Sequence, residues 1–139
     1  MLKKLQELHA SIMTSLDNMG MLTAMPQPAM DRLPKVRLAL TRASRDRTML
    51  LERTYDELIA RAPFGQQAAL QVLRAEGKES LITSVRHIGT WTLREVTSRW
   101  PEYCVASNTI QAEMRARVRK EVALTYPMLA ELSVNVLVS

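Results

Sequence analysis

The sequence has little glycine, proline, cysteine or aromatic residue. Its 139 residues include four glycines, six prolines and one cysteine, and aromatic residues make up 4%. Cys104 alone cannot form an intramolecular disulfide, so we expect a reducing compartment and predict a cytoplasmic protein. No run of about 18 apolar residues is present, so no membrane-spanning helix or membrane association is expected. Polar residues interrupt the apolar ones near the N-terminus, so no secretory leader is expected.

The residues that are abundant favour helices. Apolar residues make up 47% of the chain and nine residues are methionine. Methionine, leucine and alanine are strong helix formers, and the scarcity of glycine and proline leaves long stretches uninterrupted. The length suits one domain, so we predict a single all-α domain over residues 1–139.

Prolines divide the chain into four predicted helices. The first spans Leu2 to about Thr23, the second Met30 to Ala60, the third Phe64 to Arg99, and the fourth follows Trp100-Pro101. Short connections between helices of this length predict an up-down-up-down four-helix bundle.

Each helix carries a stripe of apolar residues at three- and four-residue steps, which is typical of a bundle helix. The predicted stripe of the third helix consists of Leu70, Leu73, Leu81, Val85, Ile88, Thr92 and Val96.

Four positions suggest caps or breaks. Asp31 is the candidate cap of the second helix, with Pro34 tolerated in its first turn. Gly77 is a candidate break in the third helix. Pro127 is expected to kink or interrupt the fourth. The apolar tail 132–139 is expected to pack across the bundle or against a partner.

Residues 117–129 resemble the helix end E-x-x-L-(Y/F)-P-x-L of hemerythrin-like (HHE cation-binding) domains, with Thr125 as one extra residue. Residues 47–58 resemble a degenerate copy, and residues 5–12 resemble the family's opening L-x-x-x-H-x-x-(I/L). This resemblance implies a hemerythrin-like bundle.

The same resemblance implies a di-iron site of about five histidines and two carboxylates, which this sequence lacks. The family's two H-x-x-x-E motifs would fall on Asp46 and Leu50, and on Arg117 and Glu121, so only His9 and Glu121 match. Two histidines cannot serve two irons, so we expect no metal and no cofactor. His9, His87 and Glu121 are the candidates for a mononuclear metal site.

A second candidate site is a run of basic residues. Seven basic and two acidic residues lie between Arg32 and Arg53, so this segment carries the chain's net charge of +5. Helical spacing puts Lys35, Arg42, Arg45 and Arg53 near one side, opposite the apolar stripe. Arg37 and Arg47 point elsewhere, with Arg47 close to the stripe. Stacking aromatics and a recognition-helix pattern are missing, so solvated charge is favoured over nucleic-acid binding.

The sequence contains no glycine-rich phosphate loop, no G-x-S-x-G and no C-x-x-C. We therefore predict no catalytic residues and a non-enzymatic protein that acts by binding a partner protein or by self-association. Metal binding with a reduced ligand set and anion or nucleic-acid binding through residues 32–53 are the alternatives. The sequence leaves a small-molecule ligand open.

Overall fold

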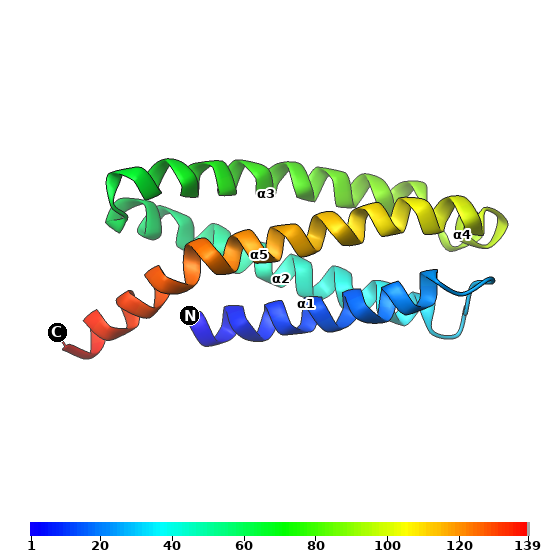
Figure 1. Cartoon of the computed structure of the whole chain (residues 1–139), viewed down its shortest axis with the longest axis horizontal. Helices are drawn as coiled ribbons and strands as arrows, with labels where there is room; N and C mark the ends of the chain where they lie inside the picture. Colours follow the sequence, from blue (N-terminus) through cyan, green and yellow to red (C-terminus); the bar gives the residue numbers. More distant parts are fainter. Residues whose placement is uncertain (139) are drawn as a thin grey trace.

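The computed structural model describes the backbone of residues 1–138 and the side chains of residues 1–132. The chain is all-helical, as predicted, and residues 1–138 contain no strand. The helices are α1 (Leu2–Thr23), α2 (Leu33–Arg61), α3 (Phe64–Thr90), α4 (Leu93–Ser98) and α5 (Trp100–Val138). The four long helices lie alongside one another, and the chain reverses direction from each to the next (Figure 1). No helix in this described part is both long and apolar enough to cross a membrane.

The prediction for α1 is confirmed. The helix ends at Thr23, whose hydroxyl donates back to the carbonyl of Met19 at 3.0 Å. The residues that recur at three- and four-residue steps along this helix are buried, so this face packs into the core as the spacing requires; they are Leu5, His9, Ile12, Leu16, Met19 and Leu22.

The start of α2 differs from its prediction. The helix begins at Leu33 rather than Met30, and the residue at its N-cap is Arg32, so Asp31 does not cap it. Residues 30–32 form a turn closed by the amides of Arg32 and Leu33 on the carbonyl of Ala29. Pro34 lies in the first helical turn, where its missing amide costs nothing.

The predicted third helix is two helices. Helix α3 ends at Thr90, and Thr92 starts α4 by accepting a hydrogen bond from the amide of Glu95 at 3.3 Å. The side chain of Trp91 is buried beside Trp100 and Tyr103. The chain therefore turns where the large indole enters the core.

Gly77 and Pro127 both lie inside continuous helices, so the break considered at Gly77 and an interruption at Pro127 are wrong. Pro127 removes one backbone hydrogen bond without ending α5, and the C-terminal part of α5 runs at an angle to its start (Figure 1). In the apolar tail the backbone of 133–138 is helical. Leu132, the first residue of the tail, packs against the buried cluster that includes Leu5 and Leu129, and the side chains of 133–139 lie outside the described residues.

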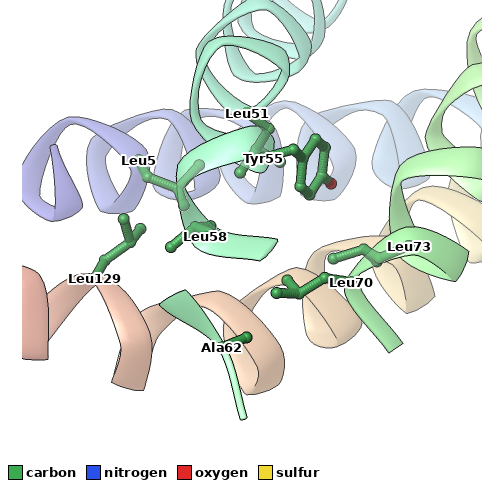
Figure 2. Packing of buried hydrophobic residues seen from close by; sticks show 8 residues of the cluster. All are labelled: Leu5, Leu51, Tyr55, Leu58, Ala62, Leu70, Leu73 and Leu129. Atoms are coloured by element: carbon green, nitrogen blue, oxygen red, sulfur yellow. The ribbon is translucent and has the colours of Figure 1, made fainter. Parts of the chain in front are cut away.

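One end of the molecule has a dense apolar core. Leucines from all four long helices point toward one another around Tyr55 (Figure 2). The cluster consists of Leu5, Leu51, Tyr55, Leu58, Ala62, Leu70, Leu73 and Leu129. Burial of each leucine contributes about 1.5–3 kcal/mol, so this cluster holds the first half of α3 against its neighbours.

The second half of α3 does not join this core. The predicted stripe residues Leu81, Val85 and Ile88 are exposed, and no residue from 74 to 90 is buried. The residues of this half that face the other helices include Gly77, Ser80 and Ser84, which are too small to fill the space. The prediction that Leu81, Val85 and Ile88 belong to a buried stripe is therefore wrong, although all three line the open space between α3, α2 and α5.

Candidate functional site

A buried carboxylate on α5 organises a cluster of charged side chains. Glu121 is fully buried, and its Oε1 accepts hydrogen bonds from His9 Nε2 at 2.9 Å and Arg47 Nη1 at 3.0 Å. Its Oε2 lies 3.0 Å from Arg117 Nε, an ion pair without the angle of a hydrogen bond. Burial by itself raises the pKa of Glu121, but the His9 hydrogen bond and the charges of Arg47 and Arg117 together lower it below its ordinary value. Glu121 is therefore held as a carboxylate.

A hydrogen-bonded relay leads from this carboxylate toward the surface. Because the carboxylate can only accept, His9 Nε2 is the donor to Glu121, and His9 Nδ1 is hydrogen-bonded to the Tyr126 hydroxyl at 2.6 Å. Burial and the charge of Glu121 raise the pKa of Tyr126. The hydroxyl therefore stays protonated at neutral pH and is a poor nucleophile.

Arg117 crosses from α5 to α3 at Gly77. Its Nη1 donates to the carbonyl of Leu73 at 3.0 Å, and its Nη2 donates to the Tyr55 hydroxyl at 3.4 Å. A Cβ at Gly77 would lie 2.5 Å from Nη2. Glycine at this position thus provides the clearance for a buried guanidinium and does not mark a helix break. Burial also raises the pKa of Tyr55 to about 12, so it remains a neutral partner.

The same two arginines line a cleft between α2, α3 and α5. The cleft has a volume of about 270 Å³ and is bounded mainly by apolar surface, with Leu40, Leu81, Val85, Ile88, Ile110 and Met114 on its walls. Hydroxyl residues alternate with these on the facing helices, among them Ser44, Ser84 and Ser107. This volume lies just below the range of about 300–1,000 Å³ typical of small-molecule pockets. The cleft exists because the second half of α3 does not pack closely against α2 and α5.

The wall that α2 contributes carries unpartnered hydrogen-bond donors. Arg37 Nη1, Ser44 Oγ and Arg47 Nε are buried atoms with no hydrogen-bond partner within the described part of the chain. All three residues line the cleft. Buried polar groups in folded proteins nearly always have a partner, so three on one wall call for an explanation.

Aromatic residues close the end of the cleft next to α4. Arg37 donates to the Trp91 carbonyl at 2.6 Å, and its guanidinium lies 5.7 Å from the centre of the Tyr103 ring. The His87 ring stacks on that of Tyr103, with the ring centres 5.9 Å apart. Burial, together with the charge of Arg37, lowers the pKa of His87. The positive charge at this end of the cleft therefore comes from the arginine.

The three candidate metal residues are not brought together. His9 and Glu121 are hydrogen-bonded to each other, while His87 lies against Tyr103 at the α4 end. Arginine and histidine donors already occupy the Glu121 carboxylate. Within the residues that the structure describes, no group of three or more His, Cys, Asp or Glu side chains could hold a metal ion.

The basic residues of α2 divide as their spacing predicts. Lys35, Arg42, Arg45 and Arg53 are all exposed, whereas Arg47 is buried and Arg37 is half-buried. Among the four exposed residues, only Arg45 reaches the rim of the cleft.

Sequence reasoning missed the cleft and the role of its arginines. Two signals were available, namely the position of Arg47 near the apolar stripe and the place of Arg117 at a ligand position of the resembled motif. Nothing in the sequence shows that both guanidiniums meet the carboxylate of Glu121. Ser44 and Arg37 gave no comparable signal.

Comparison of this chain with models of known families, with curated proteins and with solved structures finds no match.

Proposed function

We propose that this chain is a non-enzymatic binding protein that receives a small ligand in the cleft between α2, α3 and α5. In this proposal the long helices form an up-down-up-down bundle that is opened on one side by α3. The observation that supports it is the 270 Å³ cleft, whose walls are mostly apolar and whose α2 side carries unpartnered donors. Descent from hemerythrin-like domains remains a prediction.

The packing gives a physical reason why the cleft is not closed. Protein interiors are normally packed as densely as organic crystals, and a cavity in the core lowers stability. Here the positions of α3 that face inward hold Gly77, Ser80 and Ser84, where leucine-sized residues would have filled the space. An apolar ligand body in the cleft would restore the missing contacts with Leu81, Val85 and Ile88.

Filling the cleft tests this proposal. Ser84→Leu places an apolar side chain in the space, and burial of that side chain should raise the free energy of unfolding by about 1–2 kcal/mol. The neutral apolar dye Nile red should bind to the natural protein and lose at least tenfold in affinity for the variant. Lys78→Leu adds the same side chain at an exposed position of α3 outside the cleft, and should leave dye binding unchanged.

Two outcomes would count against the proposal. One is the absence of saturable Nile red binding to folded protein. The other is equal affinity for the natural chain and for Ser84→Leu, because binding would then lie elsewhere on the surface.

Self-association is a second candidate, favoured by apolar exposure on α3. Leu81, Ile82 and Val85 are each at least half exposed, and such a patch also suits contact with a second copy of the chain. Sedimentation equilibrium would show a concentration-dependent dimer that is lost in Ile82→Glu. A strict monomer over the full concentration range would refute this candidate and leave the cleft proposal intact.

A further inference from the structure

The positive charge on the cleft wall exceeds the negative charge that it contacts. Arg47 and Arg117 share one carboxylate, that of Glu121. Arg37 forms no ion pair with any side chain of residues 1–132, and its only hydrogen bond goes to the Trp91 carbonyl. The acidic residue of the lining, Glu113, is exposed at the rim. Of the three guanidiniums, Arg47 and Arg117 therefore share one buried carboxylate and Arg37 has none, which favours a negatively charged partner.

Two of the three unpartnered donors, Arg37 Nη1 and Arg47 Nε, belong to these guanidiniums. Arg47 is 94% buried, given its relative exposure of 6%, yet its Nε has no partner among the described atoms. A buried charged donor without a hydrogen-bond partner lowers stability. Arginine forms particularly strong hydrogen bonds with carboxylate and phosphate oxygens. Ser44 Oγ lies in the same lining as a third free donor.

The register of α2 explains why these donors line the same cleft. Arg37 and Ser44 are seven residues apart, which at about 100° per residue returns to nearly the same side of the helix. Arg47 is three residues further, again on the inner side, and the whole set spans about 15 Å of helix. Arg42 lies between them in sequence but on the exposed outer side of α2, so a substitution there is a matched control for substitutions at Arg37 and Ser44.

Resting on the proposed function, we infer that the ligand of the cleft is an amphipathic organic anion. Its carboxylate or phosphate head binds at one of the two donor positions of the α2 wall, either at Arg37 near α4 or at Ser44 and Arg47 further along the helix. Its apolar body lies along the exposed residues Leu81, Val85 and Ile88 of α3. The high ratio of apolar to polar wall means that a free inorganic anion would leave most of the cleft unfilled. A purely apolar ligand would leave the donors without partners.

The test compares probes with the same eight-carbon chain and different heads. Octanoate, octyl phosphate, 1-octanol and octylamine are titrated against the intact protein by calorimetry. We expect octanoate or octyl phosphate to bind at least tenfold tighter than 1-octanol, because charged hydrogen bonds of this kind are worth about that factor. Octylamine should bind weakest. The tighter of the two anions identifies the head group, and its affinity should fall as salt is added.

Variants assign the head to α2. The variant that removes the donor holding the head, Arg37→Met or Ser44→Val, should reduce the affinity for the anion toward that of 1-octanol, and Arg42→Met on the outer side should not. Arg37 and Ser44 lie outside the contacts of Glu121, so these variants keep that ion cluster. Arg47→Met is a weaker test because it also removes a partner of Glu121.

The results separate this inference from the proposal beneath it. If 1-octanol binds as tightly as both anions, or if Arg37→Met and Ser44→Val leave anion affinity unchanged, the inference of an anionic head is overturned while the cleft remains a binding site. If none of the four probes binds and Nile red also fails to bind, both are overturned.

Discussion

Replacing Glu121 by glutamine should destabilise the fold far more than any exposed charge change. The carboxylate is fully buried, and nitrogen atoms of His9, Arg47 and Arg117 lie within 3.0 Å of its oxygens. Glutamine keeps the shape but removes the charge, which leaves two buried guanidiniums without an anion. Breaking a buried ion pair in this way costs about 3–5 kcal/mol. We expect a loss of that size from the free energy of unfolding.

The measurement is urea unfolding followed by far-ultraviolet circular dichroism at neutral pH. The matched control is Glu76→Gln, which removes an exposed ion pair with Lys120 and should change stability by less than about 1 kcal/mol. The combined variant Glu121→Leu, Arg47→Met, Arg117→Met removes all three charges. It should recover most of the loss, because a buried ion cluster can be replaced by apolar side chains at little cost.

One outcome would refute this reasoning. If Glu121→Gln unfolds within about 1 kcal/mol of the natural protein and of Glu76→Gln, the two arginines do not depend on the carboxylate. The ion cluster around Glu121 would then contribute little to holding α1, α2 and α5 together.

Three further predictions follow from the same contacts. Gly77→Ala should lower the free energy of unfolding by about 1–2 kcal/mol because the new Cβ displaces Arg117. In an Arg117→Met background the same change should raise the free energy of unfolding by about 1 kcal/mol, because alanine has the higher helix propensity. Equal effects in both backgrounds would contradict the close contact. Because the folded pKa of Glu121 is lowered, its stabilisation is complete above the unfolded value of about 4.3 and is lost as pH falls through the folded value. Unfolding free energies measured from pH 7 to pH 3 should therefore fall more steeply for the natural protein than for Glu121→Gln, and parallel curves would argue against this linkage. Tyr126→Phe should lower the free energy of unfolding by about 1 kcal/mol because it removes the hydrogen bond between the Tyr126 hydroxyl and His9 Nδ1, and the same urea experiment measures this loss.

Local sequence determined most of the helical architecture. Proline and glycine are scarce, and apolar residues recur at helical spacing, so the helical state and the end of α1 at Thr23 could be read directly. The exposure of Lys35, Arg42 and Arg53 followed in the same way from their position opposite the stripe. These features depend on residues a few positions apart, for which helix geometry is known in advance.

Other features required the tertiary structure, because they depend on residues far apart in the chain. Spacing alone predicted that Leu81, Val85 and Ile88 are buried, but burial needs a neighbouring helix at the right distance, and the second half of α3 stands off. Likewise Gly77 gives no sign in the sequence that Arg117, forty positions later, passes over it.

The candidate site shows the same division. His9 and Glu121 could be singled out from the sequence, yet their partner Arg47 was known only as a residue near an apolar stripe. Helical periodicity states which side of a helix a residue is on, but not which atoms it meets there. The meeting of two guanidiniums on one carboxylate, and the open cleft beside them, was decided by how the long helices pack.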